Sequence, residues 1–118
     1  MKVALTVWEN RISPLFDAAS MLLIADIENG RISKKYLEAI KSGAQCRRVG
    51  KLYDMGVDIL ICGGISAFYA NLIEARGIKI IPFTAGGIDE VLDAYIDGNI
   101  YKKNYRMPGC EILSFQNL

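Results

Sequence analysis

Hydrophobic and polar positions follow two different rhythms in the two halves of the chain. In the first half, apolar and β-branched residues run together over 2–8 and 21–28, which predicts two buried strands. Asn29-Gly30 comes directly after the second run, and this dipeptide is typical of a two-residue hairpin turn because both of its positions need positive φ. Residues 31–38 are therefore predicted to return as an antiparallel third strand, and residues 9–16 to form a loop.

The second half alternates between helical and strand patterns. Helices are predicted where apolar residues recur every three or four positions, and strands where short apolar runs follow a glycine. The predicted order is helix 44–55, strand 57–62, helix 66–76, strand 78–83 and helix 88–98. The repeated helix-glycine-strand passage implies a βαβ unit, whose two strands run parallel.

These elements predict an α/β fold with one five-stranded mixed sheet and flanking helices. In the simplest arrangement only the second strand is reversed, and the strands of the second half lie beside the first strand. Residues 1–100 are expected to form a single domain. Residues 101–118 lack clear periodicity and are expected to form a C-terminal tail that is ordered only in part.

Glycines gather in the loops that follow the strands running in the direction of the first one. In the predicted topology these loops lie at one edge of the sheet, here called the carboxyl edge, and they span 9–16, 39–46, 62–66 and 83–88. Ligands of open α/β sheets bind at such an edge. Three of the loops carry glycine just before a helix, in Ser42-Gly43, Gly63-Gly64 and Gly86-Gly87.

Any one of these glycine turns is explained by tight strand-to-helix geometry alone. Three of them at one edge favour a binding site, because glycine lets the backbone approach a ligand and a helix start offers free N–H groups. We therefore expect bare amide hydrogens to face a common hollow suited to an anion. The turns do not match either nucleotide-binding glycine fingerprint.

Composition excludes several classes of function. The 118 residues are 52% hydrophobic and 23% charged, which is typical of a folded domain. The net charge of +1 gives no reason to expect a nucleic-acid partner. The sequence contains no histidine, so it cannot form a Ser-His or Cys-His nucleophile pair or an imidazole metal site. Because the sequence has neither a signal-peptide pattern nor a membrane-length apolar run, we expect a cytoplasmic protein without a membrane partner.

The three cysteines are sparse and widely spaced, which fits a reducing compartment better than a disulfide framework. Cys62 ends a predicted buried strand and precedes Gly63. It is either a small core residue or a thiolate whose pKa the next helix lowers for metal binding. Cys46 lies in the first turn of its predicted helix, where the same two interpretations apply. Cys62 and Cys46 are the candidate metal ligands, and Cys110 in the tail is an outside candidate.

Several motifs together resemble one protein family. They are the S-x-x-F loop of Ser13-Pro14-Leu15-Phe16, the Asn29-Gly30 hairpin, the element VDILICGGIS and the ending GGIDEVLDAYIDG. This pattern, which spans roughly residues 1–100, is similar to the dinitrogenase iron–molybdenum cofactor biosynthesis family of the NifX and NafY type. The resemblance implies a ribonuclease H-like three-layer fold. It also implies a non-catalytic protein that binds or carries the iron–molybdenum cofactor or another molybdenum–sulfide cluster, with possible donor or acceptor proteins.

Such clusters are anionic, so the carboxyl edge is the expected site. The candidate cofactor-binding residues are Asn10, Arg11, Ser13, Gly43, Cys62, Gly63, Gly64, Thr84, Gly86 and Gly87. Arg47 and Arg48 flank the same edge and could pair with an anion. The family loop often reads S-x-H-F-G, in which the histidine is a candidate cluster ligand. Here Leu15 and Asp17 stand in place of that histidine and glycine.

Two other functions fit the same residues. The replacement by Leu15 favours a regulatory or partner-binding domain that keeps the fold and binds no cluster. A metal-dependent hydrolase would need several converging carboxylates. The predicted loops of the carboxyl edge offer Glu9 and Asp17, with Asp89 in the following helix, which makes the hydrolase the weaker interpretation.

Overall fold

The computed structural model describes residues 1–40 and 45–107. Its strands are β1 (Lys2–Trp8), β2 (Arg11–Ile12), β3 (Met21–Glu28), β4 (Arg31–Ala39), β5 (Ile59–Ile61) and β6 (Lys79–Ile81). Its helices are α1 (Gln45–Asp54), α2 (Ala67–Ala75) and α3 (Ile88–Ile96), with the short 3-10 helices η1 (Phe16–Ala18) and η2 (Lys103–Tyr105). The three predicted α-helices and five predicted strands are all present.

The strands form one mixed sheet in the order β4-β3-β1-β5-β6. β3 is antiparallel to both β1 and β4, whereas β5 is parallel to β1 and β6 is parallel to β5. This confirms that only the second long strand is reversed, and that the strands of the second half lie beside the first. The predicted number of five strands is wrong by one, because the sheet has six strands within the described residues and β2 pairs with β1 outside the main order.

The additional strand arises from a tight hairpin where a loop was predicted. Trp8 pairs with Arg11, and the two residues between them, Glu9 and Asn10, have φ of 50° and 63°. Two successive positive φ values are the geometry of a type I′ turn, whose twist matches that of the strands it joins. The sequence signal is weak because Glu9 is not a typical residue for this turn.

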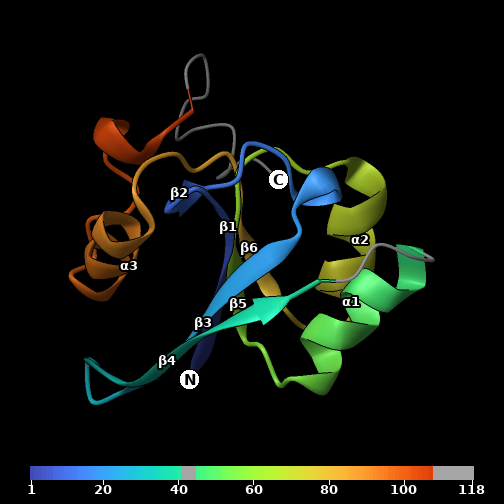
Figure 1. Cartoon of the computed structure of the whole chain (residues 1–118), viewed down its shortest axis with the longest axis horizontal. Coiled ribbons are helices and arrows are strands. Elements are labelled where there is room, and N and C mark those ends of the chain that lie inside the picture. The colour runs from blue at the N-terminus through green and yellow to red at the C-terminus, as the bar shows by residue number, and fades with distance from the viewer. Residues whose placement is uncertain (41–44, 108–118) are drawn as a thin grey trace.

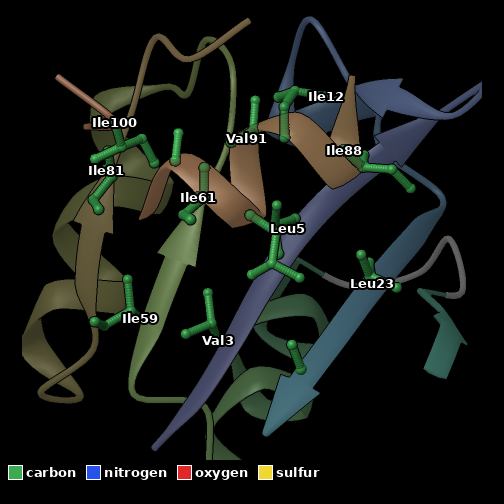
Figure 2. Packing of buried hydrophobic residues seen from close by; sticks show 13 residues of the cluster. Val3, Leu5, Ile12, Leu23, Ile59, Ile61, Ile81, Ile88, Val91 and Ile100 are labelled. Carbon is green, nitrogen blue, oxygen red and sulfur yellow. The ribbon is translucent and has the colours of Figure 1, made fainter. Parts of the chain in front are cut away.

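Helices cover both faces of the sheet, with α3 on one face and α1 and α2 on the other (Figure 1). Alternate residues of β1 point to opposite sides, so that Val3 and Leu5 pack with α3 while Ala4 packs with α1 and α2. Figure 2 shows the core on the α3 side, where Leu5 and Ile61 from neighbouring strands face Val91 of the helix. No helix of the described residues is both long enough and apolar enough to span a membrane.

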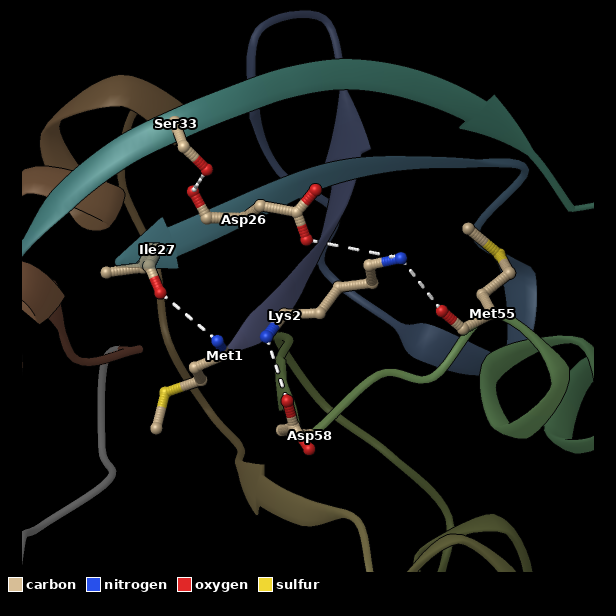
Figure 3. Close-up of polar contacts among 7 residues, drawn as sticks. All are labelled: Met1, Lys2, Asp26, Ile27, Ser33, Met55 and Asp58. Atoms are coloured by element: carbon tan, nitrogen blue, oxygen red, sulfur yellow. Dashed lines mark hydrogen bonds and ion pairs between the residues drawn. The ribbon is translucent and has the colours of Figure 1, made fainter. Parts of the chain in front are cut away.

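A group of polar contacts lies near the N-terminus, at the edge of the sheet opposite the carboxyl edge (Figure 3). The N-terminal ammonium donates to the Ile27 carbonyl at 3.1 Å, and the Lys2 amide donates to Asp58 Oδ2 at 2.8 Å. The Lys2 ammonium reaches the Met55 carbonyl at 3.0 Å and lies 4.0 Å from Asp26 Oδ1. These contacts connect β1 to β3 and to the segment before β5. They hold these strands together at one end, and the carboxyl edge lies at the other end.

Candidate functional site

The Gly63-Gly64 turn packs against the loop of residues 13–16. The Gly64 amide donates to the Pro14 carbonyl at 2.8 Å, and the Phe16 amide donates to the Gly64 carbonyl at 2.7 Å. A β-carbon on Gly63 would lie 2.5 Å from the Ser13 carbonyl oxygen, so only glycine fits there. At this turn the expectation of a bare amide facing a hollow is wrong for Gly64, because the chain's own backbone takes the place expected for a ligand.

A carboxylate of the chain lies at the start of α2. The Ser66 amide donates to Asp17 Oδ1 at 3.1 Å, and the Tyr69 amide donates to Ser66 Oγ at 3.4 Å. Ser66 is therefore the N-cap of α2, as its place before the predicted helix indicated. Because a negative charge already lies at the positive end of this helix, an anionic ligand would meet repulsion there.

Cys62 has no surface accessible to solvent and belongs to the core on the α1 and α2 side. Burial, and to a smaller extent the charge of Asp17, raise the pKa of its thiol from 9.0 to about 12. The interpretation of Cys62 as a thiolate of lowered pKa is therefore wrong, because desolvation exceeds any effect of the helix that follows. The core alternative describes this residue.

The second glycine turn, Thr84–Gly87, lies between two other segments of the chain. On one side the Ile12 amide donates to the Gly86 carbonyl at 2.9 Å, and the Ile88 amide donates to the Asn10 carbonyl at 3.0 Å. These bonds place Arg11 opposite Gly87 as antiparallel partners. For the amides of Gly86 and Gly87, no acceptor is found in the described parts of the chain.

The other side of this turn is bordered by residues 105–107, which begin at the last residue of η2. The Ala85 amide donates to the Tyr105 carbonyl at 3.0 Å, and the Met107 amide donates to the Phe83 carbonyl at 2.9 Å. Arg106 is thereby the antiparallel partner of Thr84. The Arg106 side chain is only 9% exposed, and its guanidinium carbon lies 5.1 Å from the centre of the Tyr101 ring. A cation on an aromatic face is attracted by the ring quadrupole, which helps to hold the guanidinium in place.

Phe83 enters this turn with a φ of 55°. A bulky side chain rarely adopts the left-handed region, and such residues persist where the surrounding contacts hold them. The Phe83 amide donates to the Gly63 carbonyl at 2.8 Å, and the Thr84 amide donates to the Cys62 carbonyl at 2.9 Å. The two glycine turns are thus linked to each other through the backbone.

The structure brings nine of the predicted site residues to the carboxyl edge in two groups. Ser13, Cys62, Gly63 and Gly64 form one group, and Asn10, Arg11, Thr84, Gly86 and Gly87 form the other apart from the buried Thr84 side chain, whose hydroxyl donates to the Ile81 carbonyl at 3.3 Å. Gly43 and Cys110 lie outside the described residues, and for Cys46 only the helical backbone of α1 is described.

Two arginines differ from their predicted roles. Arg48 was expected to flank the site, but its Nη1 donates to the Ala19 carbonyl at 2.6 Å and to the Phe16 carbonyl at 3.3 Å, so it supports the loop from inside. Arg106 was missed, because it lies in the stretch predicted as a tail. The available signal was the charge of Lys102, Lys103 and Arg106 close behind the last predicted helix. Backbone pairing without an apolar pattern leaves little trace in a sequence.

A family model described as dinitrogenase iron-molybdenum cofactor matches residues 1–98. The chain belongs to this dinitrogenase iron-molybdenum cofactor family. The match confirms the resemblance carried by the sequence motifs. It extends over most of the chain and includes both glycine turns.

Several individual proteins are similar to this family member. The uncharacterized protein MJ0580 of Methanocaldococcus jannaschii is 28% identical over 109 residues, which cover 86% of this chain and 91% of the relative. The crystal structure of PH0822 has a TM-score of 0.79 at 21% identity and covers 83% of this chain and 90% of its own. The apo form of the orange protein from Desulfovibrio gigas has a TM-score of 0.65 at 18% identity, over 83% of this chain and 88% of its own. The similarity to these two solved structures is a similarity of fold.

For a member of the iron-molybdenum cofactor family, the side chains at the carboxyl edge are poor in metal ligands. Among the described residues, no group of three or more Cys, Asp or Glu side chains is arranged to hold a metal ion. Leu15, which stands at the family's histidine position, is 43% exposed and is the bridge partner of Gly64. What the described part of this edge offers is the exposed Arg11 side chain and the amides of Gly86 and Gly87, while the Cys62 thiol is buried.

Proposed function

We propose that this chain binds and carries an anionic molybdenum–sulfide or iron–sulfide cluster, such as the iron–molybdenum cofactor, as a non-catalytic accessory protein. The observation that carries the proposal is membership of the iron-molybdenum cofactor family over residues 1–98. The carboxyl edge supports it, because the exposed Arg11 side chain and the Gly86-Gly87 amides are the kind of donors that sulfide and oxide anions accept from. The fold in this proposal is of the ribonuclease H-like type, and the cluster comes from donor proteins and passes to acceptors in the cytoplasm.

Binding of this kind is electrostatic and reversible. Hydrogen bonds to a charged acceptor are shorter and stronger than neutral ones, and partly buried cations are screened less by salt. A carrier benefits from this arrangement, because a cluster held without covalent protein ligands can be released without breaking a metal–thiolate bond. The proposed contacts are Asn10, Arg11, Gly86 and Gly87, whose turn offers amides without an acceptor in the described parts of the chain. Ser13, Gly63, Gly64 and Thr84 lie at the same edge but bond to the chain itself or are buried, as is the Cys62 thiol. Gly43 and Cys46 stay predictions from the sequence.

The direct test is strictly anaerobic purification followed by elemental analysis and an absorption spectrum. Protein purified without metal is then titrated with tetrathiomolybdate and, separately, with isolated iron–molybdenum cofactor. We expect saturable binding with a change in the visible spectrum at one equivalent. Cys62→Ala serves as a second sample and is expected to bind equally well, since the thiol is buried. Absence of a spectral change and of retained metal with every cluster tried contradicts the proposal.

A partner-binding domain without a cluster is the second candidate. The observation that favours it is the exposure of two apolar side chains: Leu15 is 43% exposed and Phe68, in the first turn of α2, is 51% exposed. Exposed apolar side chains are typical of protein contacts. In this case metal-free protein recovers a specific partner from extracts, and the double variant Leu15→Ser, Phe68→Ser loses it. Recovery that requires cluster-loaded protein favours the carrier instead.

A further inference from the structure

β4 is an edge strand that has a neighbouring strand on one side only. It stands at one end of the main strand order, where it pairs with β3 (Figure 1). β4 has nine residues, whereas β6 at the other end of the order has three. A long edge strand presents a row of backbone donors and acceptors with which a further strand can pair. Within the described sheet, β4 is therefore the strand best suited to receive one.

The ladder between β3 and β4 determines which backbone groups of β4 face outward. The Ile40 amide donates to the Ser20 carbonyl at 2.8 Å, just beyond the last paired residues of the two strands. Hydrogen-bonded and non-hydrogen-bonded pairs alternate along an antiparallel ladder. Counting back from Ile40, the N–H and C=O groups of Leu37 and Lys35 point away from β3. In the described parts of the chain, no other segment pairs with these groups.

α1 lies beside the end of β4 without covering this part of the strand. Ala39 follows the same alternation as Leu37, and its outward carbonyl accepts a hydrogen bond from Lys51 Nζ of α1. Two residues earlier, the Leu37 side chain is 57% exposed. A hollow of about 580 Å³ adjoins Lys51 on the surface of the helix, and its other lining residues are Arg47, Gly50, Asp54 and Met55. The outward side of β4 is thus open, and an apolar side chain lies on it.

The side chains of β4 are complementary to an antiparallel copy of the same strand. A two-fold axis at Tyr36 places Lys35 opposite Leu37 of a second copy, and their outward backbone groups then form hydrogen-bonded pairs. In the same register Lys34 lies opposite Glu38 of the second copy, once on each side of the axis. Opposite charges in directly opposed positions stabilise an antiparallel pair, and like charges destabilise it. The charge pattern of β4 therefore favours pairing with itself.

Two other registers would use the same outward groups and fit less well. An axis at Lys35 would place two lysine side chains directly opposite each other. An axis at Leu37 would pair Lys35 with Ala39, whose carbonyl already accepts from Lys51. The register centred on Tyr36 avoids both conflicts.

Lysines on an edge strand commonly oppose association, but the two central lysines of β4 are placed differently. Lys35 is paired with Asp89 of α3 at 3.2 Å, and Lys34 lies opposite a carboxylate in the Tyr36 register. The irregularity between Asp26 and Ile27 in the pairing with β3 ends the regular part of β4 before Lys34. The shared ladder is therefore short, and short interfaces give weak, reversible association.

We propose that this chain forms a weak two-fold symmetric dimer, in which β4 pairs antiparallel with β4 of a second copy and one sheet runs through both molecules. The contacts between Lys34 and Glu38 of opposite copies set the register. Leu37 is covered by the aliphatic part of Lys35 of the second copy. The dimer does not depend on the carrier function, since none of the proposed cluster contacts takes part in it.

The experiment is sedimentation velocity of the full chain between about 10 µM and 1 mM, the range in which small interfaces associate. The wild type should pass from monomer to dimer as its concentration rises. Lys34→Glu and Glu38→Lys each place like charges opposite each other on both sides of the axis, and each should weaken dimerisation about tenfold or more. An equimolar mixture of the two variants should regain the dimer, because opposite charges then meet across the interface.

The mixture separates contact between copies from effects within one chain. Glu38 also pairs with Lys51 of its own chain at 3.3 Å, so Glu38→Lys alone disturbs more than the interface. Recovery in the mixture can arise only between two chains. Lys79→Glu is the matched control, because it reverses an exposed lysine of β6, at the other end of the sheet, and it should dimerise like the wild type.

Leu37→Pro tests the backbone pairing without changing a charge. Proline removes an N–H that faces away from β3, a position at which an edge strand tolerates it. This variant should keep the circular dichroism spectrum of the wild type and remain monomeric. If a charge variant does not fold, Leu37→Pro decides the question, and a folded Leu37→Pro that dimerises like the wild type overturns the proposal.

Three further results would overturn it. The first is a wild type that remains monomeric at about 1 mM, which would leave the β4 edge to a different occupant. The second is wild-type affinity in both folded charge variants. The third is a mixture of the two variants that stays monomeric although each of them folds.

Discussion

Gly63 lies so close to Pro14 that a β-carbon at position 63 would be 2.6 Å from the Pro14 carbonyl oxygen. The obstacle is backbone, which cannot rotate away as a side chain could. We therefore expect Gly63→Ala to lower the free energy of unfolding by about 1–3 kcal/mol, the usual cost of forcing an extra carbon into a packed site. Urea unfolding followed by circular dichroism measures the change.

Gly50 in α1 provides the control for this substitution. A β-carbon there has no atom within 4 Å, and alanine is a better helix former than glycine. Gly50→Ala should therefore raise the free energy of unfolding by about 0.5–1 kcal/mol. If Gly63→Ala is as stable as the wild type, the 13–16 loop is able to move away from the Gly63-Gly64 turn. That turn would then again be a candidate ligand site.

The buried thiol of Cys62 predicts a specific loss of stability in alkali. Burial raises its pKa from 9.0 to about 12, so above pH 9 the unfolded chain releases a proton that the folded chain retains. The folded state then binds more protons than the unfolded state, and stability falls as pH rises. It is fully present below pH 9 and decreases by about 1.4 kcal/mol per pH unit at most between pH 9 and 12. Denaturant unfolding at several pH values measures this slope.

Cys62→Ala is the comparison for the alkaline titration. This variant loses some packing at every pH, but its stability should fall less steeply above pH 9 than that of the wild type. Labelling with a thiol reagent at pH 8, followed by peptide mapping, should leave Cys62 unmodified in folded protein and modify it in denaturant. Rapid modification in the folded state would contradict the buried position and restore Cys62 as a possible metal ligand.

Arg48 and Arg47 are neighbours in sequence with different consequences on substitution. Arg48 donates to the Ala19 and Phe16 carbonyls and is buried, whereas Arg47 is exposed. Arg48→Met should lower the free energy of unfolding by about 1.5–3 kcal/mol, because hydrogen bonds from a charged donor are lost and their acceptors remain buried. Arg47→Met should change it by about 0.5 kcal/mol or less. Similar losses in the two variants would argue against the inward position of Arg48.

Most of the fold could be predicted because its signals are local. The Asn29-Gly30 turn has φ of 54° and 73°, as that dipeptide favours, and it sets the register of β3 and β4. The apolar runs and the glycines after the helices predicted β5 and β6 as parallel strands, and in the structure β5 pairs with β1 and β6 pairs with β5. Residues 105–107 were missed because they pair with a segment about twenty residues earlier in the chain and have no hydrophobic period of their own. The β2 strand was missed because it is only two residues long and its turn contains Glu9.

The site was predicted in part for the same reason. Chain topology brings the loops after β1, β5 and β6 to one edge, so the meeting of the glycine turns could be foreseen. The reason for the glycine at each turn could not be foreseen. Glycine is required both where the backbone approaches a ligand and where it approaches another stretch of backbone. Only the three-dimensional structure shows that Gly63 faces Pro14, whereas Gly87 faces the segment around Arg11.

The Glu9-Asn10 turn provides a last prediction, because it sets the position of Arg11. Glu9 has a φ of 50°, a conformation that costs most non-glycine residues about 1–2 kcal/mol and that asparagine tolerates better. Glu9→Asn should therefore raise the free energy of unfolding by several tenths of a kcal/mol to about 1 kcal/mol. Glu28→Asn is the control, since Glu28 ends a strand before the other hairpin turn and should gain nothing. A Glu9→Asn variant no more stable than the wild type would mean that the β1–β2 hairpin is not a populated structure in solution, and Arg11 would then lack the fixed position opposite Gly87.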